Sequence, residues 1–407
     1  MEKVALRGFI FNNILTGLVF IFIYGPPFSG LPINISTLIL FPLLLIVFFR
    51  RNMLKNFSPL LFKWEMLLLI FMLSYSFILA AYSQQLDLFF LFFVLIIFSL
   101  PSAYLISNIA ENYQSGALIN ALINAAFIAA LISICLMFYP EFNHFVKFSL
   151  LKYDETLMQY QLFRGFGLSD ELLFSYSITQ SVALYFCLIS KKKIVSKAIY
   201  GTAILISIAV NAKIGLVCAL IVFIIATIKS KIDFKKAFKF IVVISTFFMF
   251  LLNTPVLGDI VGDQLFSTVN EISGGALDDG AAESSTHTLL NEMLFIPNNV
   301  VDIVFGNGLS IFGQGERSSD SGWVLIIHYG GLFFFVSTLL LILACVIRLI
   351  NIRETSFAFV FLIIFFLANT KGLFFAPKPG AKTLALVYFS MIIGNYSKPK
   401  RILAASR

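Results

Sequence analysis

Arg164 stands in a segment whose composition suits the binding of an anionic group. The segment reads Phe-Arg-Gly-Phe-Gly-Leu, and Gly165 and Gly167 allow backbone N–H groups to approach a ligand closely. Asp170 and Glu171 follow and begin an expected helix, whose N-terminus also favours an anion. A solvated arginine in an ordinary loop is the alternative interpretation of Arg164.

Three further cations stand where the sequence is polar or where an apolar segment ends. Arg317 is the one strong base of the polar interval 253–320, which carries ten acidic residues. Its guanidinium suits phosphate oxygens because its N–H donors form a planar fork. Lys213 and Lys371 end apolar segments, where a lysine either extends its amine to the membrane surface or pairs with an anion.

Four side chains are candidates for a general base, and the sequence does not choose among them: His287, Glu171, Asp170 and Asp320. His287 lies near the start of an expected short helix, which Ser284 or Ser285 can cap and which Pro297 ends. This amphipathic helix is expected to lie on the membrane surface over the bundle. An interfacial hydrogen bond is the alternative role of His287, and capping the next helix is the preferred role of Asp320. Within a span, a histidine such as His328 more commonly satisfies a neighbouring group.

The composition places these residues in a membrane protein. Hydrophobic residues make up 59% of the 407 residues and charged residues only 12%, whereas soluble domains carry roughly a quarter charged residues. The net charge of +8 arises from short basic clusters between apolar runs, which is typical of membrane orientation signals and not of a nucleic-acid-binding patch. The four cysteines lie in apolar segments without metal-ligand spacing, so neither a disulfide framework nor a metal site is expected.

Apolar runs predict about twelve membrane-spanning helices. They cover 9–24, 35–49, 64–82, 88–106, 117–139, 171–190, 198–210, 214–228, 240–252, 322–347, 357–367 and 383–395. A cytoplasmic N-terminus then places 21 of the 29 Lys and Arg residues inside, as the positive-inside rule requires. The eight cations outside are Lys147, Lys152, Arg164, Lys213, Arg317, Lys371, Lys378 and Lys382. Both termini are therefore expected in the cytoplasm.

The expected fold is an all-α polytopic bundle with a helical cap. Residues 1–252 form a first bundle part of nine spans, with an outer loop at 140–170. Residues 253–320 form the long outer loop with its amphipathic helix, and 321–407 form a second bundle part of three spans. The expected inner loop at 107–116 carries no Lys or Arg.

Several short motifs and this topology together resemble the bacterial O-antigen polymerase (Wzy-type) family, in the wider class of O-antigen polymerases and ligases. The outer turn Asn211-Ala212-Lys213 and an Arg-Gly pair in the medium outer loop contribute to the resemblance. It is strongest across 301–332, through Phe305-Gly306-Asn307-Gly308, Ser319-Asp320-Ser321-Gly322-Trp323 and His328-Tyr329-Gly330-Gly331.

The resemblance implies a multi-pass glycosyltransferase of the bacterial inner membrane, acting on the periplasmic side. It implies transfer of a growing glycan from undecaprenyl diphosphate to the terminal sugar of a new undecaprenyl-diphosphate-linked unit, without a metal, a nucleotide sugar or another cofactor. Arg164 and Arg317 would bind the diphosphate. Lys213 stands where the family often has Arg after Ser or Thr, and His287 is nearest to another family arginine. Membrane lipid, a chain-length regulator and a flippase of the pathway are the implied partners.

Three alternatives remain open. An O-antigen ligase performs related chemistry on a lipid A core acceptor, but its usual His-Asn pair is absent at His287-Thr288 and His328-Tyr329. A flippase for the same lipid-linked unit is disfavoured because the two halves show no repeat of loop lengths and no Gly- or Pro-broken spans in matching positions. A non-enzymatic membrane partner of a synthesis complex fits the outer cations poorly.

Overall fold

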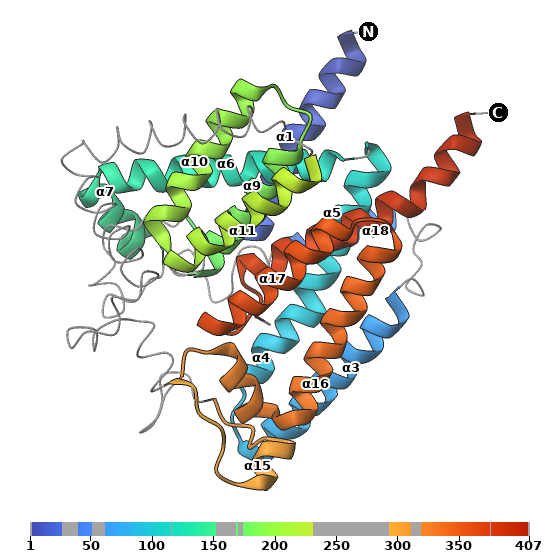
Figure 1. Cartoon of the computed structure of the whole chain (residues 1–407). Helices are drawn as coiled ribbons and strands as arrows, with labels where there is room; N and C mark the ends of the chain where they lie inside the picture. The colour runs from blue at the N-terminus through green and yellow to red at the C-terminus, as the bar shows by residue number, and fades with distance from the viewer. Residues whose placement is uncertain are drawn as a thin grey trace. The chain divides into compact units, whose positions relative to one another are not determined.

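The structure is a computed structural model that describes residues 2–26, 40–50, 62–114, 116–151, 168–169, 174–230, 293–310, 319–374 and 376–405. Within these ranges the regular elements are helices, with no strand (Figure 1). The all-α fold predicted from the sequence is therefore confirmed.

The chain forms two compact units, which are described separately. The first comprises Met1–Val47, Ser102–Leu265 and Lys378–Arg407, and the second comprises Phe48–Pro101 and Phe266–Pro377. Each unit thus combines residues from before and after the long polar interval. Helices of the first unit are α1 (Glu2–Tyr24), α6 (Ala117–Phe138), α7 (Pro140–Phe145), α9 (Phe174–Ile189), α10 (Ile194–Asn211), α11 (Lys213–Ser230) and α18 (Pro379–Ala405). Those of the second are α3 (Lys63–Ser83), α4 (Asp87–Phe93), α15 (Val300–Phe305), α16 (Gly322–Asn351) and α17 (Thr355–Lys371), while α2 (Phe41–Arg50) and α5 (Leu100–Tyr113) cross the division.

Several helices have the length and composition of membrane spans. Five are long and apolar enough to cross a membrane: Lys63–Ser83, Asp87–Tyr113, Ala117–Phe138, Ile194–Asn211 and Gly322–Asn351. Shorter apolar helices occupy Gly8–Tyr24, Phe174–Ile189, Ile214–Ser230 and Thr355–Lys371. Every expected span except 240–252, which lies outside the described residues, overlaps a helix of the structure.

Some helices run farther than the apolar pattern predicts. The expected inner loop 107–116 shortens to three residues, because α5 continues to Tyr113 and α6 begins at Ala117. The extension packs on α18, where the Ser390 hydroxyl bonds the Glu111 carboxylate at 2.6 Å. The interval between the expected spans 357–367 and 383–395 likewise shortens to 372–378. The described start of the outer loop 140–170 is helical, in α7 and in the π-helical turn Val146–Leu150.

Helix α9 is the core of the first unit. Every residue from Phe174 to Leu188 is buried, and α6, α10, α11 and α18 pack around the helix. The approach of α11 is close because Gly215 has no side chain: a Cβ there would lie 2.4 Å from the Ser177 Cβ. A helix buried on all sides is normally apolar all round, so the polar residues of α9 need partners inside the unit.

In the second unit, α3 and α16 are joined by an ion pair and by direct packing. The Arg348 Nε lies 2.6 Å from a Glu65 carboxylate oxygen, and both residues stand near helix ends. Helix α16 is broken at Gly331, where φ is 62° and ψ is −163°. The sequence pattern did not predict this break within a span.

Candidate functional site

Five of the predicted site residues lie outside the described residues: Arg164, Arg317, His287, Asp170 and Glu171. Most of the predicted cap helix near His287 lies outside them too. Their roles therefore stay predictions.

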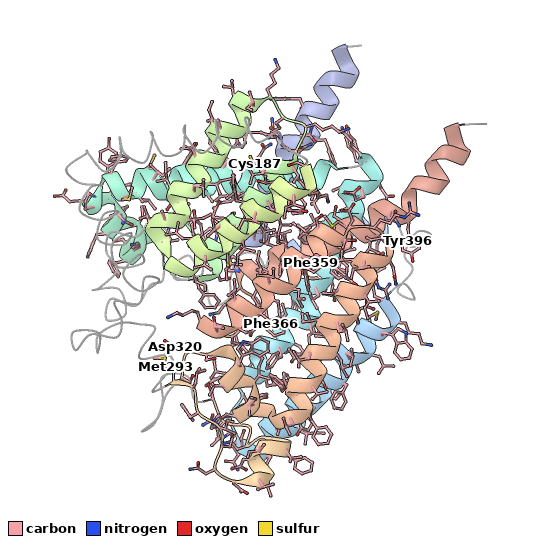
Figure 2. The ribbon with its side chains drawn as sticks, in the orientation of Figure 1. Cys187, Met293, Asp320, Phe359, Phe366 and Tyr396 are labelled. Carbon is pink, nitrogen blue, oxygen red and sulfur yellow. The ribbon has the colours of Figure 1, made fainter. Side chains whose placement is uncertain are left out.

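Asp320 and Lys371 lie in the second unit, where the start of α16 meets the end of α17. The Ser321 hydroxyl reaches the Asn369 carbonyl at 3.4 Å, and a Cβ on Gly322 would lie 2.4 Å from the Gly372 carbonyl oxygen. Ser321, and not Asp320, occupies the N-cap position of α16, so the preferred capping role of Asp320 is wrong. The Asp320 side chain is exposed beside Met293, whose carbonyl accepts a hydrogen bond from the Ser319 hydroxyl (Figure 2).

Lys213 is the first residue of α11 in the first unit. Helix α10 ends at Asn211, so Ala212 alone connects the two helices, and the predicted tight turn is confirmed. The Gly215 N–H bonds the Ala212 carbonyl at 3.0 Å and closes the turn. The backbone of Lys213 thus stands two residues from Asn211, which belongs to a buried polar cluster.

This cluster, called the α9 cluster below, consists of Tyr24, Ser133, Tyr176, Gln180, Ser207 and Asn211. The Tyr176 hydroxyl is 2.7 Å from the Ser207 hydroxyl, and the Asn211 amide donates to the Ser133 hydroxyl at 3.0 Å. The Gln180 amide donates to the Tyr24 hydroxyl at 3.2 Å. Four helices (α1, α6, α9 and α10) therefore contribute to one buried hydrogen-bond network.

The orientation of two buried amides leaves acceptor oxygens unused. The Gln180 amide nitrogen donates to the Ala126 carbonyl at 3.2 Å, and the Asn211 nitrogen donates to the Ser207 carbonyl at 2.7 Å. A backbone carbonyl only accepts, so neither amide can be rotated by half a turn. The Gln180 Oε1, the Asn211 Oδ1 and the Ser177 Oγ have no hydrogen-bond partner in the part of the chain that the structure describes. Oxygens of this kind can accept from hydroxyl donors.

Lysines of α18 and the segment before it stand at the N-terminal end of α9. The Lys378 amine lies 5.6 Å from the centre of the Phe174 ring, and the Gly380 N–H donates to the Ser175 hydroxyl at 2.8 Å. One turn farther along, the Thr383 hydroxyl reaches the Thr179 hydroxyl at 3.4 Å, and the neighbouring Lys382 is only 2% exposed. Positive charge, the N-terminus of a helix and a layer of hydroxyl groups are therefore combined at this end of the first unit.

The opposite end of α9 carries a different lysine site. The Lys192 amine donates to the Asn124 amide oxygen at 3.1 Å and lies 4.2 Å from the centre of the Tyr200 ring. Partial burial lowers the pKa of Lys192, and the neighbouring Cys187 acts in the opposite direction. This lysine anchors the turn between α9 and α10 to α6.

Metal chemistry has no support in the described ranges, where no three His, Cys, Asp or Glu side chains group as metal ligands would. Of the four predicted bases, Asp320 lies within these ranges. The predicted or candidate anion-binding side chains within them are lysines.

Sequence reasoning missed the α9 cluster, although a signal was present. The predicted span 171–190 contains Ser175-Tyr176-Ser177 and Thr179-Gln180-Ser181, two polar triplets within an apolar segment. Polar residues in a span mark buried contacts or function more often than chance. Because the topology argument used only charged residues, it passed over these neutral ones.

No protein-family model, no curated protein and no solved structure matches this chain. The resemblance to the polymerase family therefore rests on the motifs and the topology.

Proposed function

We propose that this protein polymerises lipid-linked repeat units of a surface polysaccharide such as O-antigen. It transfers the growing glycan from undecaprenyl diphosphate to the terminal sugar of a new undecaprenyl-diphosphate-linked unit. The observation that carries the proposal is the combination of Lys378 and Lys382 with the buried hydroxyls around α9 and with acceptor oxygens that have no partner in the described ranges. The resemblance across the motif residues supports the same function.

The chemistry asks for these residue types. The bond between the donor sugar C1 and the diphosphate oxygen breaks, and a bond from C1 to the acceptor hydroxyl oxygen forms. Negative charge develops on the leaving diphosphate, where fixed positive charge stabilises it, and the hydroxyl proton passes to a base. The sequence makes Arg164, Arg317, Lys213 and Lys371 the proposed diphosphate ligands, and within the first unit Lys378 and Lys382 are further candidates.

The α9 cluster suits the saccharide part of such a substrate. Sugar hydroxyls are hydrogen-bond donors, and the Gln180 Oε1 and the Asn211 Oδ1 are acceptors without partners in the described ranges. The base remains one of His287, Glu171, Asp170 and Asp320. Of these, Asp170 and Glu171 precede α9 in the sequence and so are the nearest along the chain to the lysine and hydroxyl layer.

The membrane arrangement belongs to the same proposal. We infer twelve spans in the bacterial inner membrane, both termini in the cytoplasm and a site that faces the periplasm. A long periplasmic loop with a helical cap covers that site. The distribution of Lys and Arg supports this topology.

One observation favours a second candidate, a flippase for the same lipid-linked unit. Transporters often bind their substrate at broken spans, and α16 is broken at Gly331. A ligase acting on lipid A core remains the closest enzymatic alternative.

The length distribution of surface polysaccharide in the native host distinguishes the three functions. After deletion of the gene, we expect core bearing a single repeat unit, with the ladder restored by the intact gene. Long glycan retained on the lipid carrier would instead indicate a ligase. Unpolymerised units trapped inside the cell would indicate a flippase.

Single variants then test the lysine layer. We expect Lys382→Gln to lower polymer formation by about 100- to 1000-fold, the usual loss on removing one charge-stabilising donor. Lys382→Arg keeps the charge and serves as the matched control. Arg164→Ala and Arg317→Ala are expected to abolish polymer while the protein stays in the membrane, and full-length glycan from any of these three charge-removing variants would remove that residue from the site.

A further inference from the structure

The segment from Asn299 to Ser310 exposes apolar side chains in an otherwise polar interval. It contains α15 and the non-helical residues after it, and none of the six residues of α15 is buried. Val300 is 71% exposed, Val301 59% and Phe305 50%. Side chains of this kind on a water-facing loop would be unfavourable by roughly 25 cal/mol for each Å² of apolar surface.

The backbone N–H groups of this segment bond protein acceptors, although a segment in water could bond water instead. The Gly306 N–H bonds the Asp302 carbonyl, and the Asn307 and Gly308 N–H groups bond the His328 and Tyr329 carbonyls at 3.0 Å each. The next two N–H groups, of Leu309 and Ser310, bond the side-chain oxygens of Asn307 and Gln85. Five consecutive amides outside a regular helix therefore have protein partners, which is the condition for irregular backbone at membrane depth.

Glycines hold the segment directly against the break in α16. Gly306 has a φ of +76°, and a Cβ there would lie 2.2 Å from the Tyr329 carbonyl oxygen. On the other side, a Cβ on Gly331 would lie 2.4 Å from the Val304 carbonyl oxygen. The break frees carbonyls that the segment then satisfies, so the two features form one structure.

Helix α3 shows the depth of the segment. Trp64 and Tyr82 of α3 are exposed, and a rise of 1.5 Å per residue places them about 27 Å apart along the helix. This distance is close to the thickness of the hydrocarbon core of a membrane. Trp and Tyr are enriched at the two membrane–water interfaces. Tyr75 lies about two turns before Ser83, the last residue of α3. Its hydroxyl donates a hydrogen bond to the Phe305 carbonyl. A Cβ on Gly308 would lie 2.7 Å from the Leu79 carbonyl oxygen. The middle of the segment thus packs on the last two turns of a candidate span, and its last residue, Ser310, bonds Gln85 just after that helix ends.

Its exposed face also continues the exposed apolar faces of two candidate spans. The Phe305 ring stacks on Phe333 of α16 at 5.5 Å between ring centres, and Phe333 lies 6.4 Å from Tyr75 of α3. Tyr75 in turn stacks on Phe71 at 5.9 Å. Phe71, Phe305 and Phe333 are each more than 40% exposed. Lipid that covers α3 and α16 therefore covers the segment.

We propose that the segment Asn299–Ser310 lies in the membrane interface, with Val300, Val301, Phe305 and Leu309 among lipid acyl chains. It docks the end of the long loop to the membrane independently of which reaction the protein performs. The one charged residue of the segment, Asp302, is half-buried. At the membrane interface its carboxylate can stay hydrated while the apolar side chains around it contact the acyl chains.

The test uses single cysteines in the full-length protein. Cys135, Cys187, Cys218 and Cys345 are first replaced by Ala or Ser. Val301→Cys is then labelled with an environment-sensitive fluorophore and placed in phosphatidylcholine nanodiscs. We expect quenching by lipids that carry a nitroxide at acyl carbon 5, and at least threefold weaker quenching by aqueous iodide than for the exposed Asp87→Cys control.

Ile78→Cys on the exposed face of α3 reports acyl contact and completes the controls. If iodide quenches the Val301 label as strongly as the Asp87 label and the nitroxide lipid does not quench it, the proposal is overturned. Phe305→Cys repeats the measurement at a second position, so failure of one variant to fold leaves the proposal testable.

Discussion

The buried amide of Gln180 illustrates the difference between a satisfied and an unsatisfied polar group. Its nitrogen supplies the Tyr24 hydroxyl and the Ala126 carbonyl, whereas Thr338 in α16 has a buried hydroxyl without a partner in the described residues. Gln180→Leu removes the donor to the Tyr24 hydroxyl and a second donor to the Ala126 carbonyl, and is expected to cost about 1–3 kcal/mol. Thr338→Val keeps the shape, loses no bond and is expected to be neutral or stabilising. Unfolding in detergent micelles measures both; equal losses would contradict the hydrogen-bond assignment.

Lys192 makes the free energy of unfolding depend on pH in the alkaline range. Burial lowers its pKa below the ordinary value of 10.5, so between the two values the folded state holds fewer protons than the unfolded state. Stability therefore rises as the pH increases through the folded-state pKa towards 10.5. We expect the native protein to gain melting temperature relative to Lys192→Met over this window. If the melting temperatures of the native protein and of Lys192→Met change in parallel from pH 8 to 10.5, the lowered pKa of Lys192 is contradicted.

At the scale of elements, the contact between the α15 segment and the break in α16 depends on two glycines. Gly306→Ala and Gly331→Ala each add a Cβ at less than 2.5 Å from a carbonyl oxygen, on a backbone with positive φ. We expect each to destabilise the second unit by at least about 1 kcal/mol, the cost of a strained backbone conformation. Gly17→Ala in α1 meets open space and is expected to stabilise by about 0.5–1 kcal/mol. Thermal unfolding of the three variants tests whether the first two lose stability and the third gains it.

These same glycines show what the sequence could predict and what it could not. The motif Gly306-Asn307-Gly308 and the pair Gly330-Gly331 were recognised, but their mutual contact depends on tertiary packing. Hydropathy located α3, α6 and α16 well, because long apolar runs leave few other interpretations. It ended α5 early, since Glu111 is polar in the sequence, and its contact with the Ser390 hydroxyl of α18 joins residues far apart along the chain. The α9 cluster was missed for a related reason: its polar residues on α9 are visible in the sequence, but their partners on α1, α6 and α10 are set by tertiary packing.

At the scale of the whole molecule, hydropathy predicts where the spans lie, and the distribution of Lys and Arg predicts on which side each loop lies. Only five described helices combine the length and the apolar composition of a span, yet every expected span but 240–252 contains helical residues. Short apolar helices such as Phe174–Ile189 cross a membrane only when partners bury their polar groups, as the first unit does for α9. The predicted count of spans comes from the apolar runs and is supported by the distribution of Lys and Arg, and it can be tested without structural data.

Reporter fusions test that count, because one missing span inverts every loop that follows it. With twelve spans, alkaline phosphatase fused after Lys193 is expected to be inactive, and the same enzyme fused after Gly280 is expected to be active. A green fluorescent protein at the C-terminus is expected to fluoresce, since both termini lie inside. If 240–252 does not cross, the fusion after Gly280 becomes inactive and Arg317 moves to the cytoplasmic side. A periplasmic diphosphate site that uses both Arg164 and Arg317 would then be impossible, so this single measurement decides whether the two arginines can act together.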